Sequence, residues 1–379
     1  MVQTKSEVSN AANTSVLAIV LAGGQGTRFW PMSRASLPKQ FLSISDSGES
    51  LIQATVRRIE PLVGKEGVRV VAHAGLSALI AEHVPNAKLL VEPMARNTAA
   101  CIGLAAVSAL AERRGDPVLV VLPADHAVKD EESLRRALRE GIAEAQRSDV
   151  LVTIGIPPTT PHTGYGYIKR GAPVRGRTFQ VERFFEKPSV ERAKKYLEGG
   201  DYWWNSGMFV WRASVILEAF KAYLPSMYAG LQSIAAVLER YKHAGCNESA
   251  YGNQLESEIA SLFSGFEAIS IDFGVLEHAR NCVIIESEPF GWNDVGSWDQ
   301  WADNFQCDTQ GNLVKGDAIA IDSTGCVVKS DRRLIAAVGL KDVVIIDSGD
   351  ALLVVSREHV QDVRKVVDEL KRIGRSELV

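Results

Sequence analysis

The sequence has few cysteines and histidines, and those it has are scattered. None of its five cysteines forms a C-x-x-C pair, and its seven histidines include no H-E-x-x-H motif. An odd number of cysteines in a chain of 379 residues argues against a disulfide framework, and their spacing argues against a zinc site. We therefore expect reduced thiols and a cytoplasmic location.

An excess of positive charge and long hydrophobic runs are also missing. The 42 Lys and Arg residues are outnumbered by 46 Asp and Glu residues, so the net charge of −4 offers no general attraction for nucleic acid or anionic membranes. No apolar run approaches the roughly 20 residues of a membrane helix. Residues 16–22 could imitate the core of a signal peptide, but they lead into glycines rather than a cleavage site. We expect neither nucleic acid nor a membrane as a partner.

The hydrophobic pattern predicts an α/β fold. The composition, 46% hydrophobic and 23% charged, is that of an ordinary globular protein, and the length allows a large domain and a smaller one. Segments with helical spacing lie at 51–59, 76–82, 98–113 and 133–146. Short apolar runs predict buried strands at Val16–Leu21, Val68–Ala72, Lys88–Val91, 118–122 and Leu151–Ile156. This alternation indicates a Rossmann-like, mainly parallel sheet flanked by helices.

The character of the sequence changes after about Asn304. Five short apolar runs, broken by Gly, Asp and Ser, follow between residues 311 and 355. They predict a small all-β unit, either a sandwich or a coiled β-solenoid, and residues 359–372 have the spacing of an amphipathic terminal helix. The expected organisation is a loose leader at 1–14, a main domain at 15–304 and a small domain at 305–379.

Glycines directly follow the first predicted strand, in the segment LAGGQGTRFWPMSRASLPKQF. Gly23, Gly24 and Gly26 carry no side chains, so their backbone amides can approach a phosphate closely. The spacing matches neither G-x-x-x-x-G-K-[ST] nor G-x-G-x-x-G, and a plain tight turn is the alternative. Arg28 and Lys39 favour a triphosphate site, because two cations can neutralise charge on a leaving pyrophosphate. Ordinary solvated surface charge is the alternative for both.

Two aspartates are candidate metal ligands. Asp125 follows a strongly apolar strand in LPADH, and ligands of open α/β sheets bind beyond the carboxyl ends of strands. Asp294, in WNDVGSW, would supply a second carboxylate for Mg²⁺, which prefers one or two carboxylates plus substrate phosphates. A helix cap or a turn is the alternative for Asp125, and an aromatic-packed turn for Asp294. His126 is interpreted as a packed or capping histidine rather than a chemical group.

The segment EPMARNT, residues 92–98, is a candidate for base recognition. Guanine offers two donors on its Watson–Crick edge, N1–H and the N2 amine, and one carboxylate can accept both. Glu92 is therefore a candidate guanine-reading residue, although it could instead pair with Arg96 four residues later. Asn97 or Thr98 could simply cap the next helix.

Three further fragments carry the side chains that bind sugars. They are TGYGY at 163–167, FEKP at 185–188 and NSGM at 205–208. Sugar hydroxyls need many polar partners, so Glu186, Asn205 and the exposed backbone at glycines are suitable, and Lys187 could hold a sugar phosphate. Each fragment alone also fits a loop or a strand end.

Taken together, these motifs resemble the sugar nucleotidyltransferases, and within them the mannose-1-phosphate guanylyltransferases. Seven segments match in order along nearly the whole chain: 23–41, 92–99, 122–126, 164–168, 185–188, 204–209 and 292–298. The resemblance implies a Rossmann-like nucleotidyltransferase domain and a small C-terminal left-handed β-helix. It also implies Mg²⁺ or another divalent cation as cofactor, and a homodimer is the expected assembly.

The resemblance also implies roles for individual residues. The expected catalytic residues are Arg28, Lys39, Asp125 and Lys187, and the expected metal ligands are Asp125 and Asp294. The expected nucleotide-binding residues are Ala22, Gly23, Gly24, Gly26, Thr27, Glu92, Arg96, Asn97 and Thr98. The expected sugar-phosphate site is formed by Gly164, Glu186, Lys187 and Asn205.

The reaction implied is attack of mannose 1-phosphate on the α-phosphorus of GTP, giving GDP-mannose and pyrophosphate. The sugar phosphate is already an anion, so positioning and charge stabilisation suffice without a general base. Another nucleotide with glucose 1-phosphate remains an alternative, as does a non-catalytic nucleotide sensor. Many bacterial relatives carry a cupin-type isomerase domain after the transferase, and we expect no isomerase activity from this chain.

Overall fold

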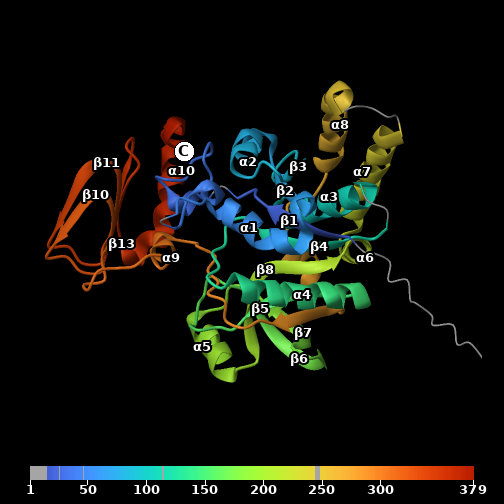
Figure 1. Ribbon diagram of the computed structural model, residues 1–379, viewed down its shortest axis with the longest axis horizontal. Coiled ribbons are helices and arrows are strands. Elements are labelled where there is room, and N and C mark those ends of the chain that lie inside the picture. Colours follow the sequence, from blue (N-terminus) through green and yellow to red (C-terminus); the bar gives the residue numbers. More distant parts are fainter. Residues whose placement is uncertain (1–14, 25, 46, 113–114, 244–247) are drawn as a thin grey trace, which may run out of the picture. The chain divides into compact units, whose positions relative to one another are not determined.

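A computed structural model describes residues 15–24, 26–45, 47–112, 115–243 and 248–379 (Figure 1). Its main feature is a nine-stranded sheet. The expected leader at 1–14 lies outside the described residues. In spatial order the strands are β3 (Lys88–Val91), β2 (Val68–Ala72), β1 (Val16–Leu21), β4 (Val118–Pro123), β8 (Tyr202–Arg212), β5 (Leu151–Ile156), β9 (Cys282–Glu286), β7 (Thr178–Phe185) and β6 (Tyr167–Arg175).

The five strands predicted from apolar runs are all present. Four have the predicted bounds, and β4 extends one residue further, to Pro123. Every residue of β5 is buried, as expected for a strand covered on both faces. The predicted helices correspond to α1 (Leu51–Val63), α2 (Ser77–His83), α3 (Asn97–Glu112) and α4 (Glu131–Arg147). The α/β fold class is therefore confirmed.

The sheet is mixed because β8 lies between β4 and β5 and runs antiparallel to both. The pairs β2–β3 and β5–β9 are parallel, and β6 and β7 form an antiparallel hairpin. The sequence pattern assigned no strands to residues 167–212, since aromatic and charged side chains interrupt the apolar alternation there. The predicted sugar-binding fragment 205–208 lies within β8, whereas the fragments 163–167 and 185–188 adjoin the start of β6 and the end of β7.

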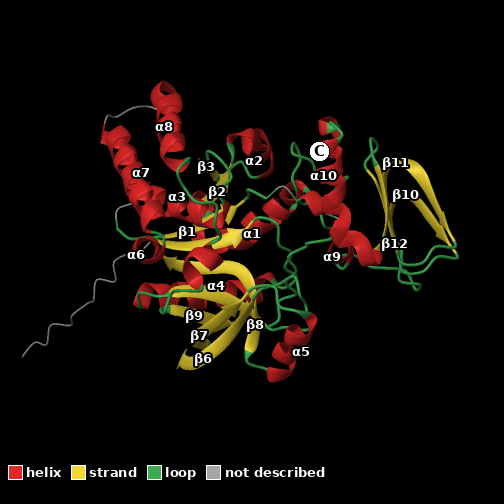
Figure 2. Ribbon diagram, turned by 180° about the vertical axis from the view of Figure 1, so that it is seen from behind, coloured by secondary structure: helices red, strands yellow, loops and turns green. Residues whose placement is uncertain are grey.

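The chain folds into two compact units. Unit 1 comprises the residues up to Ile19, with Arg96–Val121 and Ala137–Glu286, and unit 2 comprises Val20–Ala95, Leu122–Arg136 and Ser287–Val379. Unit 1 contains four helices that the sequence pattern did not predict: α5 (Val190–Gly199), α6 (Ala213–Tyr223), α7 (Pro225–His243) and α8 (Glu248–Phe263). The helices α3, α6 and α7 pack against one another, and α8 packs against α7 (Figure 2).

A second, four-stranded sheet belongs to unit 2. It contains β10 (Leu313–Ile321), β11 (Val327–Val338), β12 (Val343–Asp347) and β13 (Leu352–Ser356). The first three strands pair in parallel and β13 pairs antiparallel to β12. The predicted small β unit is therefore present, with two predicted apolar runs joined in the single strand β11.

The predicted terminal helix differs from the structure in its first half. Residues Arg357–Val363 form a 3₁₀-helix, and only Arg364–Arg372 form an α-helix, α10. Val360, Val363 and Val367 are nonetheless buried, so the apolar face is used as expected. A pattern that buries one face specifies a helix without distinguishing its pitch over a single turn.

The C-terminal strands share a hydrophobic core with the glycine-rich segment. Phe29, Trp30 and Trp298 pack in one buried cluster with side chains of β12 and the terminal helices. The indole Nε1 of Trp30 donates to the backbone oxygen of Leu378 at 2.8 Å. The C-terminal residues thus support the loop that follows β1.

No helix among the described residues is both long and apolar enough to cross a membrane.

Candidate active site

β1 ends at Leu21, and the glycine-rich segment forms the loop that follows. Gly23 and Gly24 are exposed, and a Cβ placed on Gly24 would meet no described atom within 4 Å. Gly26 has a φ of 63°, in the left-handed region, and a Cβ there would lie 2.3 Å from the Cβ of Lys39. Only glycine lets the loop pass this close to Lys39.

Lys39 lies among the charged groups of unit 2. Its side chain is 7% exposed, and Nζ donates to Asp125 Oδ2 at 2.8 Å and to the backbone oxygen of Asp294 at 2.7 Å. The ammonium also lies 5.6 Å from the ring centroid of Phe29, a cation–π contact. The structure therefore brings together Lys39, Asp125 and Asp294, which are far apart in the sequence.

A backbone bridge places Asp294 beside the loop of Asp125. Ala127 and Asn293 exchange two backbone hydrogen bonds, at 2.8 and 3.1 Å. Val295 follows with a φ of 47°, which is unfavourable for a β-branched residue, and its side chain is completely buried. The surrounding core holds this strained turn, a common feature of functional loops.

Arg28 reaches the same turn. Its guanidinium is exposed and Nη1 donates to the backbone oxygen of Gly296 at 3.0 Å. Gln300 Nε2 donates to Asp294 Oδ1 at 2.9 Å, and Gln300 Oε1 accepts from the amide of Gly296 at 2.7 Å. Gln300, which sequence reasoning missed, thus orients the Asp294 carboxylate.

His126 is a packed residue, as interpreted from the sequence. Its Nδ1 accepts a hydrogen bond from Trp292 Nε1 at 3.1 Å, and the two rings meet edge to face. Its backbone oxygen accepts from Arg58 Nη1 at 2.9 Å. Arg58 is 3% exposed, and burial lowers its pKa to about 10. Arg58 therefore anchors the loop that carries Asp125.

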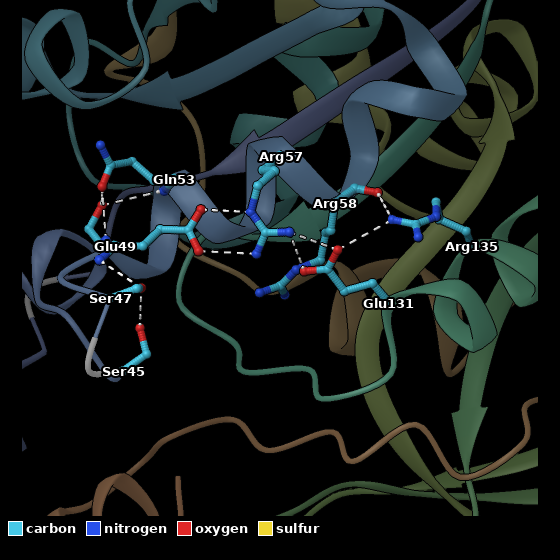
Figure 3. Close-up of polar contacts among 9 residues, drawn as sticks. Ser45, Ser47, Glu49, Gln53, Arg57, Arg58, Glu131 and Arg135 are labelled. Carbon is cyan, nitrogen blue, oxygen red and sulfur yellow. Dashed lines mark hydrogen bonds and ion pairs between the residues drawn. The ribbon is translucent and has the colours of Figure 1, made fainter. Parts of the chain in front are cut away.

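Figure 3 shows an ion-pair network next to Arg58. Arg57 binds Glu49 at 2.7 and 3.0 Å through two nitrogens and reaches Glu131, at the start of α4, at 2.8 Å. Arg135 contacts Glu131 at 3.4 Å and donates to the backbone oxygen of Arg58 at 3.3 Å. The network joins the loop before α1, α1 itself and α4.

At both Asp125 and His126, burial and neighbouring charges shift the pKa in opposite directions. Burial acts to raise the pKa of Asp125, but the Lys39 ammonium and its hydrogen bond bring that pKa below its usual value. Burial lowers the pKa of His126, although the negative charges of Asp125 and Asp294 act to raise it. At neutral pH the site therefore holds an anionic Asp125 beside a neutral imidazole.

Glu92, the predicted guanine reader, is 4% exposed. Its Oε2 would lie 3.4 Å from a Cβ placed on Gly23, so the carboxylate adjoins the first loop glycine. Gln40 Nε2 donates to the backbone oxygen of Ala22 at 2.7 Å and fixes the start of the same loop. The Glu92 carboxylate therefore lies beside the glycine-rich loop. Thr27 begins the short 3₁₀ turn Thr27–Phe29 that follows the glycines.

The predicted nucleotide residues at and just before the start of α3 belong to unit 1. Arg96 Nη2 donates to the backbone oxygen of Ser264 at 2.7 Å. Thr98 Oγ1 accepts a hydrogen bond from the amide of Ile271 at 2.9 Å. Asn97 is exposed, with a φ of 65°. Arg96 and Thr98 thus hold the backbone at Ser264 and Ile271.

The predicted sugar-phosphate residues also lie in unit 1. The backbone amide of Asn205 donates to the oxygen of Gly166 at 2.8 Å, and Glu186 Oε2 would lie 2.8 Å from a Cβ on Gly166. Lys187 has a φ of 43°, is 65% exposed in its side chain, and pairs with Glu186 Oε1 at 3.1 Å. Glu186, Lys187 and Asn205 therefore surround one glycine turn, with the ammonium open to solvent.

Gly164 lies in a loop held by aromatic stacking. Its amide donates to His162 Nδ1 at 3.2 Å, and the imidazole stacks on Tyr165 with ring centroids 3.8 Å apart. Tyr165 meets Trp204 edge to face. His162 was not predicted from the sequence, because a single histidine in a polar loop carries no spacing signal.

Asp272 is the most informative residue that sequence reasoning missed. Its Oδ1 accepts a hydrogen bond from Asn205 Nδ2 at 2.7 Å. Burial raises the pKa of Asp272 to about 6, with the Asn205 hydrogen bond lowering it and the Glu186 charge raising it. The available signal was one acidic residue inside the mainly apolar run ISIDFGVL.

Asp125 and Asp294 fit a divalent cation that is bound jointly with substrate phosphates. Mg²⁺ is usually held by one or two carboxylates plus phosphate oxygens and water. Within the described parts of the chain, no three His, Cys, Asp or Glu side chains gather into an all-protein metal cage. The donor set is thus all oxygen and incomplete without a substrate, which suits magnesium rather than structural zinc.

The loop, its cations and the mixed sheet define a class of enzyme: the chain belongs to the nucleotidyl transferase family, whose model matches residues 17–311. A second family model, described as a MannoseP isomerase/GMP-like beta-helix domain, matches residues 316–370. The latter match agrees with the sheet of β10–β13 and with the expected β-helical unit.

Individual relatives are similar over nearly the full chain. The mannose-1-phosphate guanylyltransferase RfbM of Salmonella typhimurium is 38% identical over 96% of this chain and 74% of its own length. The xanthan biosynthesis protein XanB of Xanthomonas campestris is 40% identical over 96% of this chain and 75% of its own length. A solved structure from Thermus thermophilus, described as a mannose-1-phosphate geranyltransferase, matches with a TM-score of 0.82, 35% identity, and coverage of 94% of this chain and all of that one.

Proposed function

We propose that the protein transfers GMP from GTP to mannose 1-phosphate, forming GDP-mannose and pyrophosphate. The observation that carries this proposal is the Lys39–Asp125–Asp294 cluster beside a glycine loop with an open, unhindered Gly24. Relatives named for guanylyl transfer to mannose 1-phosphate share more than a third of the sequence over almost its whole length. The expected residue roles follow from this reaction.

The reaction is a single displacement at the α-phosphorus of GTP. A phosphate oxygen of the sugar phosphate forms a new P–O bond, and the bond to the β-phosphate breaks with its electron pair leaving on pyrophosphate. No proton must be moved, because the attacking phosphate is already an anion. The chain's contribution is therefore positioning and charge stabilisation.

The residues of unit 2 suit the triphosphate. Amides of Gly23, Gly24, Gly26 and Thr27 would cradle the phosphates, and Arg28 and Lys39 would take up charge on the leaving pyrophosphate. The Ala22 amide instead donates to the backbone oxygen of Val71 at 2.9 Å, so Ala22 would shape the start of the loop. Lys39 is tied to Asp125 before substrate arrives, so its ammonium is already oriented. The carboxylate of Glu92 beside Gly23 would accept from the two donors of guanine.

The residues of unit 1 suit the sugar phosphate. The exposed ammonium of Lys187 would bind the attacking phosphate, and Glu186, Asn205 and Gly164 would contact the sugar. Arg96, Asn97 and Thr98 stay candidates for nucleotide contacts. Mg²⁺ held by Asp125 and Asp294 would supply positive charge to the phosphates when bound.

The decisive experiment measures pyrophosphate release by the purified full chain. GTP, ATP, UTP and dTTP are each combined with mannose 1-phosphate and glucose 1-phosphate in the presence of Mg²⁺. We expect release only, or at least about a hundredfold faster, with GTP and mannose 1-phosphate. Turnover with another nucleotide and glucose 1-phosphate would support the alternative transferase. Tight GTP binding without any release would support a nucleotide sensor.

A paired variant assigns the mechanism. Asp125→Asn should keep the fold, because the amide can still accept from Lys39, but should lower kcat about 10²-fold. Asp116→Asn is the matched control, because the Asp116 carboxylate accepts from Ser214 at the start of α6 rather than from Lys39. This variant should retain wild-type turnover. Near-normal kcat in Asp125→Asn removes Asp125 from the mechanism.

We propose a homodimer formed through the C-terminal sheet. Ile319 and Ile321 of β10 are 45% and 48% exposed, and Ile321 pairs with the 58% exposed Val338 of β11. Contiguous exposed apolar side chains commonly mark protein contacts. The native mass by light scattering should be twice the chain mass, and Ile321→Glu should shift it to one chain, whereas Val174→Glu on β6 should not. A monomeric wild type would refute the dimer.

We also place the protein in the cytoplasm, where nucleoside triphosphates and reduced thiols coexist. Cys282, Cys307 and Cys326 are all thiols rather than disulfides. Cell fractionation tests this location. Limited proteolysis tests the proposed domain boundary between residues 304 and 305.

A further inference from the structure

A carboxylate in unit 1 is placed like a ligand-reading group, although no motif points to it. Asp272 begins a π-helical turn, Asp272–Leu276, and its flanking residues Ile271, Gly274 and Val275 are buried. Asp272 as a whole residue is only partly buried. Single π-turns occur frequently at functional sites.

Asn205 links this carboxylate to the proposed sugar site. The Asn205 amide group is oriented at both ends, because its Oδ1 accepts from the amide of Gly207 at 3.2 Å while its Nδ2 donates to Asp272 Oδ1 at 2.7 Å. Asn205 also packs against Gly166, next to Glu186. Asp272, Asn205 and Glu186 therefore form one polar group in unit 1.

The electrostatics of this group favour a donor-bearing ligand. An ionised carboxylate can accept about four hydrogen bonds, and Asn205 supplies the one side-chain hydrogen bond to Asp272 within the described residues. The facing charged groups, Glu186 and Glu277, are both negative and raise its pKa. Sugar hydroxyls are neutral donors that relieve such a cluster, whereas a phosphate would be repelled.

We propose that Asp272 reads a hydroxyl group of the hexose in the sugar 1-phosphate and sets the enzyme's preference among epimers. Thr98 acts as a positioning residue, because its Oγ1 accepts from the amide of Ile271 and holds the backbone immediately before Asp272. The amide of Ala99 donates to the backbone oxygen of Ile269 at 3.2 Å and ties the same segment to α3. This inference rests on the proposed function and names a specificity residue for it.

The first test compares Asp272→Asn with the wild type in full-length protein. The KM for mannose 1-phosphate should rise about 10- to 100-fold, since a hydrogen bond to a charged group is lost, while the KM for GTP should stay within about twofold. Glu267→Gln, an exposed carboxylate five residues before Asp272, is the matched control and should change neither constant. Equal effects of both variants, or an unchanged sugar KM in Asp272→Asn, would overturn the proposal.

Deoxy analogues identify the hydroxyl group that is read. The wild type should lose efficiency with one monodeoxy mannose 1-phosphate, and Asp272→Asn should show no further loss with that same analogue. Additive losses with every analogue refute direct contact. Wild-type turnover in the same assay separates the outcomes: no release with any hexose 1-phosphate means that the proposed function itself has failed.

Variants of Thr98 test the positioning role. Thr98→Val keeps the shape but removes the acceptor, so it should raise the sugar KM several-fold and leave the GTP KM unchanged, and Thr98→Ser should restore the wild-type value. A rise in the KM for GTP instead would favour the nucleotide contact implied by the resemblance and overturn the positioning role. Melting temperatures of all variants, measured alongside, show whether each one folds.

Discussion

Gly26 illustrates how one residue type can be required by geometry. Its left-handed φ and the approach of Lys39 exclude any side chain, whereas Gly24 has open space in the described structure. Both are simply glycines in the sequence. Their different surroundings give them different sensitivities to substitution.

Gly26→Ala should destabilise the fold by more than about 1 kcal/mol and displace Lys39 from Asp125. Gly24→Ala should leave the melting temperature unchanged and raise the KM for GTP, because the new methyl group would occupy the space of a phosphate. Thermal unfolding together with steady-state kinetics checks both. A stable, fully active Gly26→Ala would contradict the observed loop geometry.

Asp272 gives the protein a characteristic pH dependence. Its pKa is about 6 in the folded chain, above the ordinary value of 3.8 expected when unfolded. Between these values the folded state holds more protons, so this residue makes the free energy of unfolding fall as pH rises from about 4 to about 6. A carboxyl group with a lowered pKa, such as Asp125, acts in the opposite sense.

Asp272→Asn should remove that contribution. Denaturant unfolding at several pH values should show the variant gaining stability relative to the wild type as pH rises through this window, with the difference constant above about pH 7. Any pH dependence of the KM for the sugar phosphate must likewise be compared between the variant and the wild type, because a phosphate monoester also loses its second proton near about pH 6. A pH-independent difference would mean that Asp272 titrates normally.

At the scale of elements, side chains of α1 and α4 hold the loop that carries Asp125. Arg58, in α1, reaches the backbone of His126, and the Arg57–Glu49–Glu131–Arg135 network surrounds it (Figure 3). Adjacent arginines thus have different roles. Arg57 is exposed and paired with carboxylates, whereas Arg58 is buried and bonds to backbone.

Arg58→Met should lower kcat about tenfold while changing stability by only about 1 kcal/mol, because the lost hydrogen bond is offset by removal of a buried charge. Arg57→Met is the matched control, and loss of its exposed ion pairs should cost less than about 1 kcal/mol and leave kcat unchanged. Turnover and chemical denaturation of both variants test this. Identical kcat values would show that the His126 contact does not position Asp125.

At the scale of the molecule, the C-terminal residues of unit 2 complete the core beneath the glycine-rich segment. The contact between Trp30 and Leu378 spans 348 positions in the sequence. Arg34 adds an ion pair with Asp350 at 3.1 Å, and Trp298 Nε1 donates to the oxygen of Trp30 at 3.2 Å. The C-terminal part of the chain therefore supports the glycine-rich segment.

Trp30→Phe should lower the free energy of unfolding by about 1–3 kcal/mol, from the lost hydrogen bond and the void beside it. Trp203→Phe is a suitable control, because its buried Nε1 has no hydrogen-bond partner among the described residues. That control should cost less, since no bond is broken. Equal losses in urea unfolding would indicate that ring volume alone matters at Trp30.

The sequence by itself determined the elements whose signals are local. Apolar runs located β1–β5, helical spacing located α1–α4, and the glycines with Arg28 and Lys39 predicted a candidate phosphate loop, because burial periodicity and backbone freedom are properties of short segments. The resemblance to a known family extended this to the expected substrates.

Only the tertiary structure decided the long-range placements. The insertion of β8 between β4 and β5, the bridge that sets Asp294 beside Asp125, the anchoring by Arg58 and the pairing of Asn205 with Asp272 all join segments distant in sequence. A lone charged residue in an apolar run has no local partner to reveal its role. Its function follows from the groups that folding brings to it.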